Sequence, residues 1–411
     1  MELLNNTYSI QGIAVKDLTS EFGTPLYIYN ADTITRQVTS FKNAFKNINC
    51  KVKYACKANT NLSILKEMLN NGTGLDTVSI PEIKMGLMVG FKANEIVFTP
   101  NCVDFSEIEM AVELGVHINI ENLPNLEKFG QKYGDTVPCF VRLNPGIHAQ
   151  MNSDKVDWWH KQSKFGISAN QLEKVKEFEK KYNIQIQGLH IHSSSVIMSP
   201  EIFIEGAKNI FNVVKQFKNI KYIDFGGGIK VDVGDDKEVI NLNALGKELE
   251  PVFSTFCQEY GTDIELWFEP GRYLICESGT LLTECNMIKE NGDIPFVGID
   301  SGFNQLIRPM FYKAYHEIVN TSNPSGEKKN YTVVGNICEI DNFAIDRPLH
   351  EVREKDIIAI KTAGAYGYSM ASNYNSRYRP AEVLIKNKKA YLIRKRDSFN
   401  DLIKNQILIN D

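Results

Sequence analysis

Polar side chains that could do chemistry recur in this sequence at the ends of short apolar runs. Lys57 ends the first of these runs, His192 ends the sixth and Glu269 ends the eighth. A lysine can form a Schiff base with a carbonyl compound, a histidine can stack on a flat ring, and a carboxylate can pair with a protonated ring nitrogen. Together these residue types predict a pocket for a carbonyl cofactor.

Three consecutive glycines, Gly226, Gly227 and Gly228, follow the seventh apolar run in the sequence DFGGGIK. Because glycine has no Cβ, backbone N–H groups in such a loop can approach an anion closely. The chain contains no GxxxxGK[ST] motif and no dinucleotide fingerprint, so we expect the phosphate of a cofactor smaller than a nucleotide. With Lys57 and Glu269, this loop predicts pyridoxal phosphate as the cofactor.

The elements that must position these residues alternate regularly along the chain. Apolar runs alternate with amphipathic helical patterns, which is typical of a parallel (β/α)8 barrel, and we place this barrel at residues 30–279. Chemistry in such a barrel lies at the carboxyl ends of the strands, where the loops converge. The eight predicted strands are 50–56, 74–79, 95–100, 116–120, 137–143, 186–192, 221–225 and 264–270.

Other polar side chains fall at the same strand ends, and each has a structural reading beside the functional one. Asp76 could cap a helix, Arg142 could form a structural salt bridge, and His192 could be a hydrogen-bonded core histidine. Lys57 has apolar neighbours in sequence, which leave little reason for a solvated surface lysine. The further members of this ring are Ser79, Asn101, Glu121, Asn144 and Arg272.

The pattern changes after about residue 280, where strand-like runs are separated by turns with little helix. This pattern predicts an antiparallel β domain over residues 280–411. The strand-like segments within residues 1–29 precede the barrel, and we expect them to join the same β domain.

Composition and charge exclude several classes of protein. The 46 basic and 50 acidic residues give a net charge of −4, and no basic run could follow a nucleic-acid backbone. The N-terminus lacks the pattern of a signal peptide and no run of 18 apolar residues occurs, so we expect a cytoplasmic protein without a membrane segment. The eight cysteines form no CxxC pair and predict free thiols. His190 and His192 would share a strand face, but no third ligand is near in sequence, so we expect no metal.

Motifs across nearly the whole chain resemble those of the fold-type III pyridoxal-phosphate decarboxylases, whose fold is alanine racemase-like. YACKANTN resembles the cofactor-lysine motif of that family, and AGAYGYSMASNYNSRYRPAEVL resembles its long C-terminal signature. The other matching segments are GTGLDTVS, GLHIH, DFGGGI, EPGRYL, IRPMFY and ICE.

The resemblance implies a role for each matching residue. Lys57 would bear the cofactor, His192 would stack on it, and Glu269 would pair with its ring nitrogen. Cys338, or Lys57 itself, would return a proton to the reacting carbon. The implied contacts to the phosphate are Ser195, Gly226, Gly227, Gly228 and Tyr366. The implied contacts to the substrate are Arg272, Arg308, Tyr312, Glu339 and Tyr366.

The same residues indicate an amino-acid substrate with two charged groups at its far end. Arg308 suits a second carboxylate and Glu339 suits a second ammonium, a combination that describes meso-2,6-diaminopimelate, with L-lysine and carbon dioxide as products. The family likeness further implies a homodimer in which Cys338 and Glu339 reach the neighbouring active site. A polyamine-pathway decarboxylase of the same fold and a non-catalytic cofactor-binding homologue are the alternatives.

Two segments depart from the family pattern. The sixth-strand histidine is usually followed by I-G-S-Q, whereas this chain has residues 193–196 as Ser-Ser-Ser-Val, with Ser195 on the family's serine. After Glu339 the usual S-x-D is replaced by Ile340, Asp341 and Asn342. We expect these changes to affect substrate preference and leave the cofactor unchanged.

Overall fold

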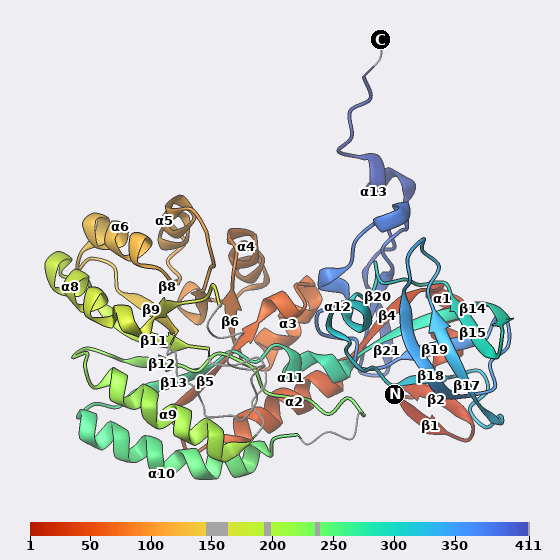
Figure 1. Ribbon diagram of the computed structural model, residues 1–411, viewed down its shortest axis with the longest axis horizontal. Coiled ribbons are helices and arrows are strands. Elements are labelled where there is room, and N and C mark those ends of the chain that lie inside the picture. The colour runs from red at the N-terminus through yellow and green to blue at the C-terminus, as the bar shows by residue number, and fades with distance from the viewer. Residues whose placement is uncertain (145–162, 193–198, 235–238, 410–411) are drawn as a thin grey trace. The chain divides into compact units, whose positions relative to one another are not determined.

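The computed structural model describes residues 1–144, 163–192, 199–234 and 239–409 of the chain (Figure 1). The backbone divides into two compact units. The first, named the barrel unit, comprises Gln37–Val231 and Glu238–Tyr273. The second, named the β unit, comprises Met1–Arg36, Asp232–Lys237 and Leu274–Asp411.

Eight parallel strands of the barrel unit form a closed ring in chain order. Each strand overlaps one of the predicted runs, so the predicted (β/α)8 barrel is confirmed. The strands are β5 (Cys50–Ala55), β6 (Gly74–Thr77), β7 (Ile96–Phe98), β8 (His117–Ile120), β9 (Cys139–Asn144), β11 (Ile186–Ile191), β12 (Tyr222–Asp224) and β13 (Glu265–Phe268), which pairs with β5 again. A short ninth strand, β10 (Ile167–Ser168), pairs with β9.

Helices connect the strands and begin and end at residues suited to those places. At the start of α4 (Ile80–Val89), the Ser79 side chain accepts the Glu82 N–H, and Gly90 ends the helix with a left-handed φ of 111°. The other main helices of this region are α2 (Ala31–Ala44), α3 (Leu62–Asn70), α5 (Phe105–Glu113), α6 (Leu123–Tyr133), α8 (Leu172–Tyr182), α9 (Pro200–Val214) and α10 (Leu242–Tyr260).

A layer of rings from four strands fills the interior of the barrel below its carboxyl end. His117, Phe140, Tyr222 and Trp267 are in mutual ring contact, with centroids 4.8–5.7 Å apart. Gly188 pairs with Phe140 in the sheet, and a Cβ on it would lie 2.2 Å from the Phe140 ring. This layer, named the aromatic floor, therefore depends on a glycine.

Residues of the aromatic floor share strand faces with polar residues nearer the carboxyl end of the barrel. Side chains two residues apart on a strand share one face. Glu269 follows Trp267 at this spacing, Asp224 follows Tyr222, and His190 follows Gly188. The residues that pack the floor therefore alternate with residues that can do chemistry.

The β unit contains a mixed sheet and a smaller sheet. In the large sheet the order is β18-β17-β15-β14-β4-β20-β21, with β16 and β19 beside β14. The strands are β4 (Leu26–Asn30), β14 (Gly279–Asn291), β15 (Ile294–Ile299), β16 (Ile318–Asn320), β17 (Lys328–Val334), β18 (Asn342–His350), β19 (Ile357–Ile360), β20 (Ala381–Lys386) and β21 (Lys389–Arg394).

Two findings differ from the predicted antiparallel sheet. The pairs β4 with β20 and β15 with β17 are parallel, while the other pairs of this sheet are antiparallel. Of the N-terminal segments, β4 lies between β14 and β20. However, β1 (Glu2–Leu4), β2 (Thr7–Ile10) and β3 (Ile13–Ala14) form a three-stranded sheet of their own. Their partners are local because tight turns join them.

All eight cysteines are free thiols, as the sequence predicted. Of the helices in the described parts of the chain, none is both long enough and apolar enough to cross a membrane.

Candidate active site

The amine of Lys57 is paired with a buried carboxylate at the carboxyl end of the barrel. Lys57 lies in a short 3-10 turn, Cys56–Ala58, directly after β5, and its Nζ is 2.5 Å from Oδ2 of Asp76. Asp76 is fully buried, and its Oδ1 has no hydrogen-bond partner among the described residues. Ser79, and not Asp76, caps the following helix. Asp76 therefore holds the lysine amine in a fixed place.

A neutral histidine, His192, directly follows β11 at the same end of the barrel. The Nδ1 of His192 accepts a hydrogen bond of 3.2 Å from the Gly227 N–H. Burial, together with the positive charges of Arg142 and Lys57, lowers the pKa of His192 to about 3. At neutral pH this ring is uncharged and can lie against an aromatic group.

Two carboxylates, Asp224 and Glu269, are buried side by side at the ends of β12 and β13. Burial, and then the charges of Asp224 and Asp76, raise the pKa of Glu269 well above its usual value. Burial raises the pKa of Asp224 to about 6. Oε1 of Glu269 and Oδ2 of Asp224 have no hydrogen-bond partner in the described structure. The buried negative charge of this pair is costly, and a protonated ring nitrogen beside it would offset that cost.

The three glycines pack tightly against both of these groups. The Gly226 N–H donates to Oδ1 of Asp224 at 2.8 Å, and the Glu269 N–H donates to the Gly226 carbonyl at 2.7 Å. A Cβ at Gly226 would lie 2.4 Å from Nδ1 of His192, and one at Gly227 would lie 2.6 Å from the Glu269 carbonyl oxygen. Since the N–H groups of Gly226 and Gly227 are already engaged, their contribution is close approach, which only glycine permits.

A group with metal-ligand character comes together here, although the sequence offered no third ligand near the two histidines. Ligand atoms of His190, Asp224 and Glu269 lie within 4.8 Å of one another. The fold supplies the two carboxylates from β12 and β13, far from His190 in sequence. This juxtaposition could not be read from local spacing.

In the β unit, a buried arginine lies among tyrosine rings. Arg308 begins the short helix α12 (Arg308–Tyr312) and is 7% exposed. Its guanidinium carbon lies 5.5 Å from the centroid of the Tyr312 ring and 6.0 Å from that of Tyr366. Tyr366 has a φ of 56°, a left-handed conformation that is uncommon for tyrosine. The arrangement presents a positive charge flanked by flat rings.

Cys338 and Glu339 are exposed and are held by the segment 374–375 of the same unit. The Cys338 N–H donates to Oδ1 of Asn375 at 2.9 Å, and Nδ2 of Asn375 lies 3.1 Å from the Cys338 sulfur. The Tyr374 hydroxyl donates to Oε1 of Glu339 at 2.9 Å. Hydrogen bonds with Cys338 and Glu339 raise the pKa of Tyr374 to about 12, so its hydroxyl stays protonated.

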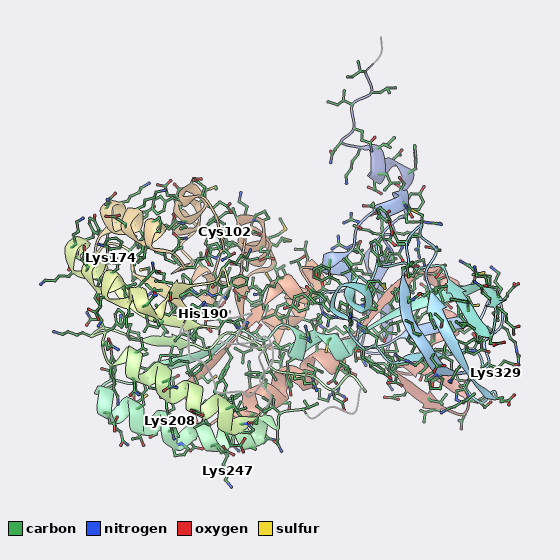
Figure 2. All side chains as sticks on the ribbon, in the orientation of Figure 1. Cys102, Lys174, His190, Lys208, Lys247 and Lys329 are labelled. Carbon is green, nitrogen blue, oxygen red and sulfur yellow. The ribbon has the colours of Figure 1, made fainter. Side chains whose placement is uncertain are left out.

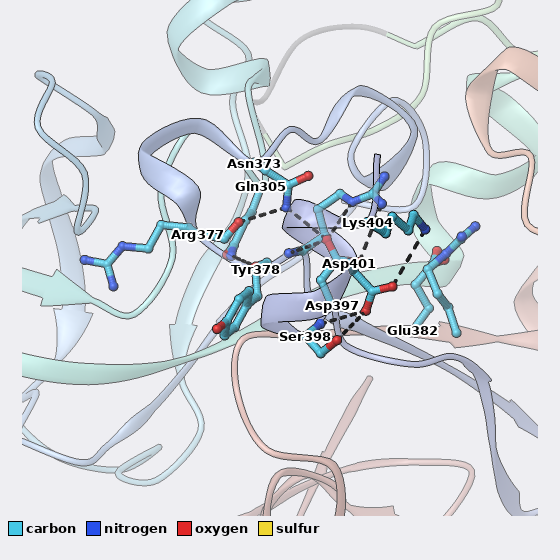
Figure 3. A network of polar contacts seen from close by, with 11 residues as sticks. Gln305, Asn373, Arg377, Tyr378, Glu382, Asp397, Ser398, Asp401 and Lys404 are labelled. Atoms are coloured by element: carbon cyan, nitrogen blue, oxygen red, sulfur yellow. Dashed lines mark hydrogen bonds and ion pairs between the residues drawn. The ribbon is translucent and has the colours of Figure 1, made fainter. Parts of the chain in front are cut away.

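A network of polar contacts fixes the segment that carries Tyr374 and Asn375 (Figure 3). Nδ2 of Asn373 donates to the Arg377 carbonyl and to Oδ2 of Asp397, both at 2.9 Å. Gln305 donates to the Tyr378 carbonyl at 3.0 Å. The residues around Cys338 therefore lie on a braced loop.

The structure describes only the second of the two segments that depart from the family pattern, residues 340–342. Residues 193–198, which include Ser195, lie outside the described residues. Asp341 is buried and its Oδ1 accepts the Gly335 N–H at 3.2 Å, so it supports its own loop, while Ile340 is 86% exposed. Burial raises the pKa of Asp341 to about 6.

Sequence reasoning missed several residues that the fold brings to these groups. Asp224 and His190 follow the inward period of their strands, and that signal was available in the sequence. Tyr374 and Asn375 lie in the long C-terminal signature, but nothing in their spacing pointed to Cys338. Arg272, which the sequence did predict, lies at the start of α11 (Arg272–Ile275), directly after the loop that follows Glu269.

The similarity to known proteins extends over nearly the whole chain. Residues 31–276 match the family model described as "Pyridoxal-dependent decarboxylase, pyridoxal binding domain". A diaminopimelate decarboxylase of Methanothermobacter thermautotrophicus is 34% identical over 97% of this chain and 95% of its own length. One of Campylobacter jejuni is 34% identical over 94% of this chain and 97% of its own length.

Solved structures of diaminopimelate decarboxylases share this fold. A crystal structure of diaminopimelate decarboxylase from M. jannaschii matches with a TM-score of 0.92 and 30% identity, covering 99% of this chain and 98% of that one. The enzyme from Helicobacter pylori, complexed with L-lysine, matches with a TM-score of 0.84 and 32% identity, covering 95% and 98%.

Proposed function

The chain belongs to the pyridoxal-dependent decarboxylases, and we propose that it removes carbon dioxide from meso-2,6-diaminopimelate to give L-lysine. The observation that carries the choice of substrate is the buried arginine Arg308 beside two tyrosine rings, to which the partner protomer would add the exposed carboxylate of Glu339. A substrate whose far end bears both a carboxylate and an ammonium group matches this pair of opposite charges.

The barrel unit fits pyridoxal phosphate. Lys57 offers an amine held by Asp76, and Glu269 offers a buried carboxylate oxygen without a partner in the described structure. His192 offers a neutral ring for stacking, and Gly228, with a φ of 100°, continues the glycine loop toward a phosphate. When bound, pyridoxal phosphate supplies a carbonyl group for the substrate amine and a protonated ring that accepts an electron pair. We propose that residues 30–279 form the domain that binds pyridoxal phosphate.

Asp76 can exchange a proton with the amine of Lys57, which the substrate amine replaces in the reaction. The 2.5 Å contact keeps Nζ oriented, and a nearby carboxylate can take up or return a proton as the amine is released. Because Asp76 is fully buried, this exchange is shielded from bulk water at the carboxylate.

Glu269 stabilises the positive ring nitrogen on which the reaction depends. Its negative charge is costly in the buried pair with Asp224, and an opposite charge beside it offsets that cost. The carboxylate is therefore prepared for a cation before the cofactor binds, which is how electrostatic preorganisation acts in catalysis.

Cys338 is the donor that we assign to the final proton transfer. Nδ2 of Asn375 and the Tyr374 hydroxyl, 3.1 and 3.7 Å from the sulfur, orient the thiol, and the Tyr374 hydroxyl also orients Glu339. Lys57 is the alternative donor. Arg272, Arg308, Tyr312 and Glu339 are assigned to the far end of the substrate, and Tyr366 is assigned to both the substrate and the phosphate. Ser195 is kept as a phosphate contact on the family likeness alone.

We further propose a homodimer in which Cys338 and Glu339 of one protomer complete the site of its partner. The exposure of both residues supports this assignment, since a proton donor must be covered when it acts. Mixing Lys57→Ala protomers with Cys338→Ala protomers tests it. Half of the randomly paired dimers would be mixed, each with one intact site, so activity should return to about a quarter of the wild-type value. No recovery on mixing would contradict shared sites. A cytoplasmic location stays a prediction.

The central experiment measures carbon dioxide released from purified protein with pyridoxal phosphate. We expect release from meso-diaminopimelate and little from ornithine, arginine or carboxynorspermidine. Release from one of the other three alone would favour the polyamine-pathway alternative. No release from any of the four, with the cofactor bound, would favour a non-catalytic homologue. Arg308→Met should abolish the preference for diaminopimelate if the arginine binds the distal carboxylate.

A further inference from the structure

His190 lies in the interior of the barrel, and the proposed reaction gives it no role (Figure 2). Its Nδ1 is 2.6 Å from Nδ2 of Asn119, and its Nε2 is 3.5 Å from Oε2 of Glu269. All three side chains are more than nine-tenths buried. The ring therefore connects an amide on β8 to the carboxylate at the end of β13.

The contact with Asn119 determines which ring nitrogen carries the hydrogen. An amide nitrogen can only donate, so Nδ1 of His190 accepts, and in a neutral ring the hydrogen is then on Nε2. That nitrogen faces Oε2 of Glu269. Nδ2 of Asn119 also lies 3.3 Å from the hydroxyl of Thr99, which holds the amide in place.

The His190 ring is neutral, which affects the charge of Glu269 beside it. Burial, and then the positive charges of Arg142, His192 and Lys57, lower the pKa of His190 well below its usual value, so the ring is neutral. A cation at this place would neutralise Glu269. A neutral donor orients the carboxylate and leaves its negative charge available.

We propose that His190 is a positioning residue for Glu269. Its Nε2 lies 3.5 Å from Oε2 and has no hydrogen-bond partner in the described structure. The Nε2 hydrogen would hold Oε2 and leave Oε1, which also has no partner there, for the cofactor's ring nitrogen. The inference rests on the proposed function only in assigning that nitrogen to Glu269.

The first test measures the affinity of the cofactor-free protein for pyridoxal phosphate by titration of absorbance and fluorescence. His190→Leu removes the donor and should weaken binding about 10- to 100-fold, as expected for a hydrogen bond to a charged group. His190→Gln places an amide nitrogen near the position of Nε2 and should stay within about 3-fold of wild type. Asn119→Leu, which frees the tautomer, should fall between them.

His117→Leu is the matched control, because His117 is another histidine of the barrel interior, half-buried, but belongs to the aromatic floor. It should lower stability without changing cofactor affinity beyond about 3-fold. Unchanged affinity in His190→Leu, or a failure of His190→Gln to rescue binding, would overturn the proposal. None of these readings uses substrate, so they stand apart from the carbon dioxide assay.

A second measurement needs no variant. Nitrogen-15 shifts of the histidine rings in the wild-type protein, with and without cofactor, report the tautomer directly. We expect His190 to be neutral with its hydrogen on Nε2 in both states. A hydrogen on Nδ1, or a charged ring, would overturn the proposal. So would a bound divalent metal at His190, Asp224 and Glu269 whose removal by a chelator abolishes cofactor binding.

Discussion

Gly226→Ala tests how the glycine loop and His192 depend on each other. Two costs are expected in the cofactor-free protein. The φ of 65° costs an alanine about 1–2 kcal/mol. The new Cβ would lie 2.4 Å from Nδ1 of His192, so the ring must turn and lose its bond from the Gly227 N–H, which adds about 1 kcal/mol. The free energy of unfolding should therefore fall by roughly 2–3 kcal/mol.

Gly261→Ala provides the matched control in the same unit. Gly261 has a φ of 83° and open space where its Cβ would lie, so only the backbone cost of about 1–2 kcal/mol applies. Urea unfolding of both variants, followed by fluorescence, gives the two free energies, and titration gives their cofactor affinities. Because His192 is displaced only in Gly226→Ala, that variant alone should also bind pyridoxal phosphate less tightly. Equal losses of stability and equal affinities in the two variants would refute the reasoning.

Three further outcomes are expected. Lys57→Ala should abolish the visible absorption of the bound cofactor and carbon dioxide release, and a variant that keeps the absorption would contradict the assignment of Lys57. Tyr374→Phe should lower kcat about tenfold without changing cofactor affinity, since it loses the hydrogen bond that its hydroxyl donates to Glu339 and the contact of that hydroxyl with the Cys338 sulfur; an unchanged kcat would remove Tyr374 from the mechanism. Burial lowers the pKa of His117 to about 4, below its unfolded value of 6.5, so stability should be lost as pH falls from 6.5 to about 4. The loss should reach at most about 3 kcal/mol and be smaller in His117→Leu.

The sequence predicted the barrel because its signals were local. Each strand was a short apolar run, and amphipathic helical patterns lay between the runs. The chemistry of Lys57 and Glu269 followed from their places at strand ends, since parallel strands of one barrel expose the same ends together.

Pairings across the barrel were not predictable in the same way. The contact of Lys57 with Asp76 depends on the register in which Ala55 lies opposite Asp76. The contact of His190 with Glu269 crosses the interior between strands that are not neighbours in the ring. Local spacing contains neither fact, so the sequence leaves both the helix-cap and the functional reading of Asp76 open and gives His190 no partner among the carboxylates.

The β unit was less predictable because its strands pair over long separations. The parallel pairing of β4 with β20 joins segments more than 300 residues apart, and a run of apolar residues does not state its partner. The contact of Asn375 with Cys338 likewise depends on a loop fixed by distant residues such as Asp397.

The pairing of Gly188 with Phe140 also bears on how this barrel could have arisen. A first substitution at Gly188 meets the ring at 2.2 Å, while a first substitution of Phe140 by alanine leaves a cavity that costs about 3–5 kcal/mol. Either order of single mutations passes through an impaired protein. Descendants of such a chain should therefore keep both residues or exchange them together, and the two positions behave in evolution as one inherited unit.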